Sequence, residues 1–275
     1  MRLEGARCLV TGSSSGIGRA TALALAAAGA HVIATARRRE DVAPLVANGL
    51  KAAELDVTDD SAVRRVVAAA EPLDLVVNNA GYGLLGAIEE VADDELLAQY
   101  DTNVFGVWRV CRAVLPSMRE RGAGAIVNVS SFGGQAPFPG IGAYRSSKFA
   151  VEGITWTLHL EVAHFGIRVL SVQPGLVETD FGTRSLRQAR AIGPASPYEA
   201  MRRAAAAAYD RMSPIALEPD VVADAIVAEL RKDRGPLRLR VGKDAERLTA
   251  AAEAGPEAYD RMVVDELGFA WHPAP

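Results

Sequence analysis

Continuous apolar runs recur along this chain, and stretches with helical periodicity separate them. The runs do not alternate between apolar and polar residues, as strands do when one face of a sheet meets water, so helices must cover both faces. Strands that alternate with helices in this way favour an α/β fold with a doubly wound parallel sheet of the Rossmann type. We therefore predict a single domain over residues 1–275, with strands at 6–12, 31–36, 52–58, 73–81, 124–131, 167–175 and 237–242.

Helices are expected at 17–29, directly after Thr58 or Asp59, at 93–121 and at 143–165. One region breaks the alternation, because residues 176–218 follow the sixth strand and contain several Gly, Pro and Arg residues. Ligands bind at the carboxyl ends of the strands in such sheets, so this insertion is predicted to be a substrate lid. An irregular surface excursion is the alternative interpretation.

The composition argues against several classes of protein. The chain is 49% hydrophobic and 23% charged, which indicates a soluble globular protein. Its net charge of −4 gives no general attraction to nucleic acid or to an anionic membrane, so neither partner is predicted. Cys8 and Cys111 lie in apolar runs and form no CxxC pair, which favours reduced thiols and a cytoplasmic location. The four His residues show no metal-ligand spacing, so no metal is predicted.

A glycine-rich turn, TGSSSGIGRA, joins the first predicted strand to the first helix. Glycines there permit a tight turn and a close approach of the backbone to a pyrophosphate, which the N-terminus of the helix then faces. The serine hydroxyls add hydrogen-bond donors. A tight turn without a ligand is the alternative. The predicted phosphate contacts are Gly12, Ser13, Ser14, Ser15, Gly16, Ile17 and Gly18.

The end of the second strand indicates which dinucleotide binds. An acidic residue there would accept hydrogen bonds from the ribose 2′-hydroxyl of NAD, whereas a basic residue suits the 2′-phosphate of NADP. This chain has Ala36 followed by Arg37, Arg38 and Arg39. We predict NADP(H), with Arg37 at the 2′-phosphate; a solvated basic turn is the alternative for the other two arginines.

Tyr144 and Lys148 lie four positions apart in a predicted helix, so they share one face. Lysine is rare in this chain, with four residues among 30 basic ones, and arginine supplies the others. A nearby cation favours phenolate and lowers the pKa of a tyrosine from about 10 towards neutrality, where a general acid–base works best. A compact ammonium also reaches where a planar guanidinium cannot.

These residues together resemble the short-chain dehydrogenase/reductases over about residues 6–180. The resemblance lies in Thr11-Gly12-x3-Gly16-Ile17-Gly18, Asn78-Asn79-Ala80-Gly81, Asn103, Ser131, Tyr144-x3-Lys148 and Pro174-Gly175. It implies a nicotinamide-dependent oxidoreductase acting on a small-molecule carbonyl/alcohol pair. The sequence as a whole is similar to those branches of the family that act on steroids, retinoids and other lipophilic carbonyls.

The resemblance also implies roles for individual residues. Tyr144 would be the acid/base, Lys148 its partner and a contact of the nicotinamide ribose, Ser131 the hydrogen-bond partner of the substrate oxygen, and Asn103 the holder of a relay water. Further cofactor contacts would be Asp56 at the adenine, Val57, Asn79, Ala80, Gly81, Pro174, Gly175, Val177 and Thr179. Other interpretations stay open: a strand-end cap for Asn78 or Asn79, a helix-entry acid for Asp56, and a strand-end turn for Ser130 and Ser131.

Arg145 departs from the family pattern, which has small residues directly after the tyrosine. Its helical position predicts that it faces away from Tyr144, at the surface or an interface. Apolar pocket walls are expected at Leu84, Leu85, Gln135, Phe138, Phe181 and Tyr198, while Arg184, Arg187 and Arg190 could meet an acidic or acyl-carrier substrate.

A homo-oligomer is expected, because helices 93–121 and 143–165 carry more apolar residues than one core face needs. Two other functions stay open: a non-catalytic nucleotide-binding regulatory protein, and an epimerase or dehydratase on the same fold. The G-x3-G-x-G spacing counts against the second of these.

Overall fold

The computed structural model describes residues 1–179 and 185–267, and its centre is a seven-stranded parallel sheet. The strand order is β3-β2-β1-β4-β6-β7-β9, the arrangement of a doubly wound Rossmann sheet. Each of the seven predicted apolar runs forms one strand of this sheet, which confirms the fold class. The strands are β1 (Arg7–Val10), β2 (His31–Ala36), β3 (Lys51–Glu54), β4 (Leu75–Asn78), β6 (Gly124–Val129), β7 (Ile167–Pro174) and β9 (Arg238–Val241).

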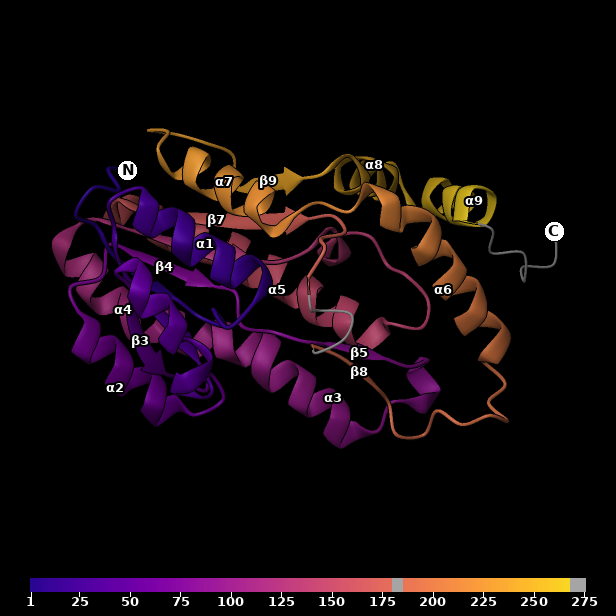
Figure 1. The fold of residues 1–275 in the computed structure, drawn as a ribbon. Helices are drawn as coiled ribbons and strands as arrows, with labels where there is room; N and C mark the ends of the chain where they lie inside the picture. The colour runs from indigo at the N-terminus through magenta and orange to yellow at the C-terminus, as the bar shows by residue number, and fades with distance from the viewer. Residues whose placement is uncertain (180–184, 268–275) are drawn as a thin grey trace.

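Helices cover both faces of the sheet (Figure 1). On one face α1 (Gly16–Ala27) and α7 (Pro219–Leu230) lie side by side, and they bury Leu25 and Ile226 against the sheet. The other face is covered by α2 (Asp60–Ala70), α4 (Gly106–Arg121) and α5 (Gly142–Val162). Because side chains on both faces are buried, the strands carry apolar residues at nearly every position.

The helix predicted over 93–121 is two helices with a π-helical turn between them. The first helix, α3, spans Asp93–Tyr100; the turn spans Asp101–Phe105, and α4 follows. Asn103 lies in the turn, where its amide is hydrogen-bonded to the backbone of Tyr82. The irregularity therefore coincides with a residue that the sequence had singled out, as π turns often do at functional sites.

The region after the sixth strand of the sheet is more ordered than a simple excursion. Its strand β8 (Leu186–Gln188) pairs in parallel with β5 (Gly83–Leu85), which follows the Asn-Ala-Gly segment. The helix α6 (Glu199–Met212) then includes the alanine-rich stretch 204–208. Phe181 and Arg184, two of the predicted pocket residues, lie outside the described residues.

Two C-terminal helices, α8 (Lys243–Glu253) and α9 (Pro256–Leu267), pack near the turn that follows β6. Phe132 and Ala136 of that turn form one apolar cluster with Leu248 and Tyr259. The Tyr259 hydroxyl donates a 2.6 Å hydrogen bond to the carbonyl of Pro137. Sequence analysis assigned no role to this end of the chain. Within the described residues, no helix combines the length and the apolar character needed to cross a membrane.

Candidate active site

The carboxyl ends of the strands bring the predicted catalytic residues together. Ser131 follows β6 directly, and Tyr144 and Lys148 lie in the first two turns of α5. The Ser131 hydroxyl accepts a 3.0 Å bond from the backbone N–H of Gly133, and it lies near enough to the Tyr144 phenol to lower the pKa of that group. The hydroxyl of Ser130 is buried without a partner among the described residues. Ser131 is therefore the serine that meets the tyrosine.

The environment of Tyr144 opposes its ionisation. Burial raises the pKa of the phenol, while the positive charge of Arg145 and the hydrogen bond with Ser131 act in the opposite direction. Sequence analysis expected Lys148 to lower this pKa. Its ammonium lies 5.7 Å from the centroid of the Tyr144 ring, and it donates a 2.8 Å hydrogen bond to the carbonyl of Val129. Arg145, and not Lys148, is therefore the cation that lowers the pKa of Tyr144, and the opposing effect of burial is larger.

Lys148 is itself buried, with 7% of its surface exposed. Burial disfavours the ammonium and lowers the pKa of Lys148 to about 8, against the opposing charge of Glu152. Glu152 lies one helical turn further along α5 and is also buried. It accepts a hydrogen bond from Ser171 and pairs with Arg238 at 3.2 Å. Sequence analysis missed Glu152, although its position four residues after Lys148 was a usable signal.

Asn103 is almost fully buried, and its side chain is fully occupied. Its Oδ1 accepts from the N–H of Tyr82 at 3.0 Å, while its Nδ2 donates to the Tyr82 carbonyl at 2.9 Å and to Ser147 Oγ at 3.1 Å. The amide therefore fixes the segment after Gly81 against α5.

The glycine-rich turn forms a cradle without room for side chains. Gly12 and Gly16 have φ of 68° and 54°, where residues other than glycine are strained. A Cβ on Gly18 would lie 2.2 Å from Nδ2 of Asn79, which donates to the carbonyls of Thr11 and Gly12 at 3.1 and 2.9 Å. Thr179 lies against Gly16. The predicted residues Asn79 and Thr179 thus meet the turn, and Ala80 is anchored to it through Thr11 Oγ1.

The three serines of the turn are not equivalent. Ser13 is fully buried, and its hydroxyl donates to the carbonyl of Val10 at 2.9 Å. Its hydroxyl thus holds the turn in place and does not point to a ligand, contrary to expectation. Ser14 and Ser15 are half-buried, and Ser15 caps α1 without a side-chain hydrogen bond. Ile17 packs on the core next to α7.

At the end of β2 the three arginines also differ. Ala36 is buried, and Arg37 is exposed with no ion-pair partner among the described residues. Arg38 forms two hydrogen bonds to the carboxylate of Asp41, at 2.6 and 3.1 Å, so it is already engaged. Arg39 is likewise exposed and has no ion-pair partner in the part of the chain that the structure describes, but it begins the following 3₁₀ turn, whereas Arg37 directly follows β2. In that part of the chain, Arg37 is therefore the unpaired cation nearest to the end of the strand.

The other predicted cofactor contacts mix local and long-range partners. Asp56 Oδ1 accepts from both the N–H and the hydroxyl of Thr58, so the helix-entry interpretation describes at least one of its oxygens. Val57 is buried against Gly106. After β7, Pro174 and Gly175 lead into Val177, which forms a bridge with Leu217. Asp244 of α8 accepts from the N–H of Leu176 at 2.6 Å, a contact that sequence analysis missed.

Arg145 contradicts its prediction, because it is 9% exposed and does not lie at the surface. Its guanidinium stacks over the Phe132 ring at 4.3 Å and donates to the carbonyl of Ala136 at 3.0 Å. The reason is steric: Gly133 has no side chain, and a Cβ there would lie 2.4 Å from Nη1.

The predicted pocket walls are only partly brought together. Leu84 is buried in a small cluster with Ala143 and Ala189, and the Tyr198 hydroxyl bonds to Glu89. Gln135 accepts from Arg240 at 3.4 Å. Nη2 of Arg190 donates to both carboxylate oxygens of Asp94, at 2.7 and 2.8 Å, so this side chain is engaged in holding the segment in place. Arg187 stacks over Tyr82 at 4.4 Å.

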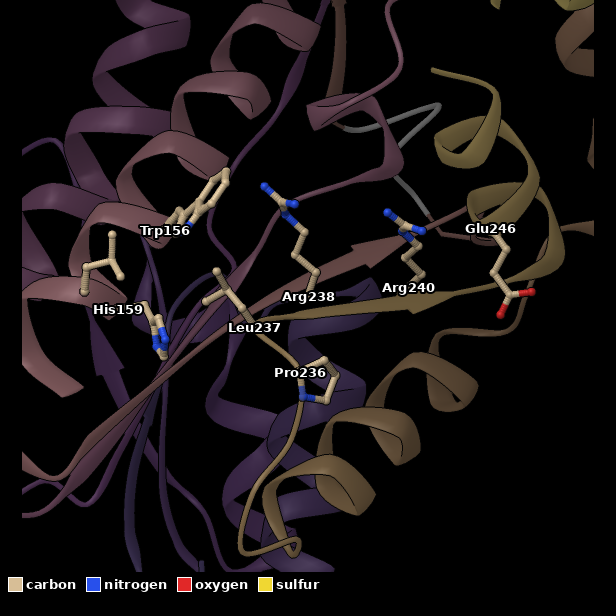
Figure 2. Close-up of a pocket in the computed structure, with 8 residues that line it drawn as sticks. Trp156, His159, Pro236, Leu237, Arg238, Arg240 and Glu246 are labelled. Atoms are coloured by element: carbon tan, nitrogen blue, oxygen red, sulfur yellow. The ribbon is translucent and has the colours of Figure 1, made fainter. Parts of the chain in front are cut away.

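A surface hollow of about 710 Å³ lies elsewhere, between α5, β9 and α8 (Figure 2). Arg238 and Arg240 project from β9 on the same side as Trp156, and Arg238 stacks over the Trp156 ring at 5.0 Å. None of the predicted catalytic residues lines this hollow. The described residues contain no cluster of three or more His, Cys, Asp or Glu side chains able to hold a metal.

Comparisons with known proteins agree with this geometry. The family model for short chain dehydrogenase matches residues 6–190. Oxidoreductase BOA17 of Botryotinia fuckeliana is 38% identical over 245 residues, which cover 86% of this chain and 88% of that protein. A short-chain dehydrogenase from Streptomyces avermitilis is 39% identical, with a TM-score of 0.84 over 98% of both chains.

A further solved structure was determined with a nucleotide bound. It is a short chain dehydrogenase from Burkholderia cenocepacia in complex with NADP, 26% identical with a TM-score of 0.76, over 97% of this chain and 99% of that one. The residues that match the family model, 6–190, include the glycine-rich turn and the residues Ser131, Tyr144 and Lys148. The chain therefore belongs to the short-chain dehydrogenase family of oxidoreductases.

Proposed function

We propose that this protein catalyses reversible hydride transfer between NADP(H) and a carbonyl/secondary-alcohol pair on a lipophilic small molecule. The observation that carries this proposal is the proximity of Ser131 to Tyr144, with the buried Lys148 one helical turn further on. A substrate oxygen that meets both hydroxyls would be polarised and protonated at one place.

The residues present fit a dinucleotide. The turn at 12–18 has Gly12 and Gly16 at positive φ, is packed closely against Asn79, and leads into the N-terminus of α1, which favours an anionic group. Gly12, Ser14, Ser15, Gly16 and Gly18 would hold the pyrophosphate, and Asp56 and Val57 would lie near the adenine. Asn79 would support the turn, the backbone of Ala80 and Gly81 would lie near the cofactor, and Pro174, Gly175, Val177 and Thr179 would lie near the nicotinamide. When bound, the nicotinamide supplies or accepts the hydride.

The chain's own groups would handle the proton. Tyr144 donates its phenolic proton to the carbonyl oxygen in reduction, and Ser131 donates a second hydrogen bond to that oxygen. Lys148 orients the ribose and supports the relay. Because the Asn103 amide is occupied by Tyr82 and Ser147, Asn103 would hold a relay water through its main-chain carbonyl.

Arg37 supports the preference for NADP(H). It is exposed at the end of β2, whereas the position that would favour NAD is the uncharged Ala36. The Burkholderia relative in complex with NADP agrees with this proposal.

The segment 176–218 is proposed to close over the substrate as a lid. Its β8 is fastened to β5, and its α6 presents Ala204, Ala205 and Met212 to the apolar cluster around Phe132.

We also propose a cytoplasmic homo-oligomer. Cys8 and Cys111 are free, as a reducing compartment requires. The aromatic patch, which we define as Phe105, Trp108, Phe149, Trp156 and Leu160, leaves large apolar side chains exposed on α4, α5 and the preceding π turn.

The test is a screen of NADPH oxidation over aldehydes, ketosteroids and 3-oxoacyl thioesters, with Tyr144→Phe as the matched control. We expect turnover in at least one class, and a kcat lower by roughly 10²–10⁴-fold in the variant with cofactor affinity nearly unchanged. A parent that binds NADPH but turns over no carbonyl, or a variant as active as the parent, would contradict the proposal.

A further inference from the structure

Arg145 presents a buried cation beside the reacting phenol. It lies directly after Tyr144, it is 9% exposed, and no carboxylate pairs with it among the described residues. Its Nε is buried without a partner. Removing a guanidinium from water without a counter-charge is costly, so the fold must compensate for this residue elsewhere.

The guanidinium of Arg145 contacts the turn that carries Ser131 and the residues directly after it. The guanidinium stacks over Phe132 at 4.3 Å, and Nη1 donates to the carbonyl of Ala136 at 3.0 Å. Gly133, which leaves space for Nη1, is also the residue whose N–H donates to Ser131 Oγ at 3.0 Å. One side chain therefore joins the helical turn of Tyr144 to the turn of Ser131.

We propose that Arg145 is a positioning residue for the reaction: it holds the Ser131 turn against Tyr144 and places a permanent positive charge beside the phenol. This inference rests on the proposed function, because it concerns the same acid/base pair. Sequence analysis had expected Arg145 to lie at the surface or an interface, facing away from Tyr144, and therefore gave it no role in the reaction.

The surrounding charges support a role distinct from that of Lys148. The charged and titratable groups near the phenol are Arg145 and Lys148 of α5, with Glu152 beside Lys148 and Tyr259 of α9 beside Arg145. The pKa of Lys148 is lowered to about 8, so its charge declines as the solution becomes basic. Burial also lowers the pKa of Arg145, but a guanidinium stays protonated throughout the working range. Arg145 thus supplies charge when Lys148 does not.

The experiment compares Arg145→Met, which keeps an apolar stem, with Arg145→Lys, which keeps a cation but loses the planar fork. Each is paired with its own Tyr144→Phe version, so the difference in phenolate absorbance during a pH titration isolates Tyr144. Arg168→Met is the matched control, since Arg168 pairs with the buried Glu229 at the opposite end of β7. It lowers stability without touching the turn.

In Arg145→Met we expect the Tyr144 titration midpoint to rise by about one pH unit, because a neighbouring cation has been removed. The limb of the kcat–pH profile should move upward with it, and kcat should fall at least about tenfold with the cofactor Kd within about threefold of the parent. Arg145→Lys should keep the midpoint but lose kcat, because the fork no longer spans Phe132 and Ala136. Arg168→Met should lower the Tm and leave the midpoint in place.

A folded Arg145→Met with an unmoved midpoint and normal kcat would overturn the inference, and so would an Arg145→Lys protein with the kcat of the parent. If Arg145→Met does not fold, Arg145→Lys alone still decides the positioning role through its kcat and midpoint. The phenol titration needs no turnover. If the parent protein reduces no carbonyl, the proposed function is wrong, but the titration of Tyr144 still tests the role of Arg145.

Discussion

At the scale of single residues, burial sets the properties of the reacting groups. Lys148 shows this most clearly, because its folded-state pKa of about 8 lies below the ordinary value of 10.5. Between these two values the unfolded chain holds more protons at this site than the folded one, so this site's contribution to stability rises with pH across that window. Below about pH 8 the buried ammonium is present at a cost in stability.

The same shift predicts how cofactor affinity varies with pH. An anionic dinucleotide favours the charged lysine, so binding above pH 8 should take up a proton. We expect the Kd for NADPH to rise with pH above 8, approaching about tenfold per unit. Fluorescence titration of NADPH from pH 7 to 9.5 measures this. Lys148→Met should bind NADPH with a higher Kd that does not change with pH. If the Kd of that variant rises with pH as steeply as that of the parent, another group is responsible for the pH dependence.

The residues at the end of β2 predict a second measurable preference. One charge-assisted bond from Arg37 to a 2′-phosphate contributes about 1.5–3 kcal/mol, so kcat/KM should favour NADPH over NADH by roughly ten- to hundredfold. Ala36→Asp/Arg37→Ala should reverse or abolish the preference. Arg38→Ala is the control, because Arg38 is held by Asp41. A parent that favours NADH would show that Arg37 does not bind the phosphate.

Some of the site residues could be predicted from the sequence, and others could not. The shared face of Tyr144 and Lys148 follows from their spacing on a helix, and the resemblance to the family pointed to Ser131 and Asn79. The structure brings Ser131 near Tyr144 and sets Asn79 against the glycine-rich turn. The roles of Ser13 and Arg145 did not follow. Each depends on a partner fixed by tertiary structure, the Val10 carbonyl in one case and the space left by Gly133 in the other.

At the scale of secondary-structure elements, the segment around β8 and α6 is fastened to the chain near β5 by ion pairs. Arg202 pairs with the buried carboxylate of Glu90 at 2.9 Å, and Ser196 also donates to that carboxylate. Hydrogen bonding to Ser196, together with Arg202 and the N–H of Ala87, lowers the pKa of Glu90. Periodicity gave no sign of this arrangement, because β5 and β8 are short and lie about a hundred residues apart.

Loss of Arg202 should loosen this segment selectively. In Arg202→Met the Glu90 carboxylate stays partly desolvated without its cation, which costs about 1–3 kcal/mol of local stability. Hydrogen exchange over 185–212 should accelerate and the substrate KM should rise, with exchange in the central sheet unchanged. Arg203→Met is the control, since the side chain of Arg203 is 76% exposed and pairs with the surface carboxylate of Glu199. Equal effects of the two variants would argue against a fastening role.

At the scale of the whole molecule, the doubly wound sheet was predictable because its strands are apolar on both faces. The exposed aromatic patch was foreseen only as an excess of apolar residues on two helices. Trp108 and Trp156 are 55% and 53% exposed, so these large side chains contribute little to the core of the domain and are available for contact with another surface.

This patch predicts an assembly that a single substitution disrupts. We expect the parent to be a dimer or tetramer by light scattering at micromolar concentration, because closed two-fold symmetry is the commonest solution for such a face. Trp108→Glu should shift the molecular mass towards the monomer without unfolding the domain. Val46→Glu, at an apolar site that is 52% exposed outside the patch, should leave the mass unchanged. A monomeric parent would refute the expectation.

The hydrogen bond from Tyr259 to Pro137 joins residues 122 positions apart and connects α9 to the loop beyond Ser131. It constrains how this scaffold can be recombined with its relatives. The glycine cradle and the end of β2 are built almost wholly from the first eighty residues, and they can be inherited as a block. The C-terminal helices cannot be exchanged alone, because their apolar contacts are with Phe132 and Ala136. A chimaera that replaces 185–267 must therefore bring residues 132–145 from the same parent, or the imported helices will meet a turn shaped for other side chains.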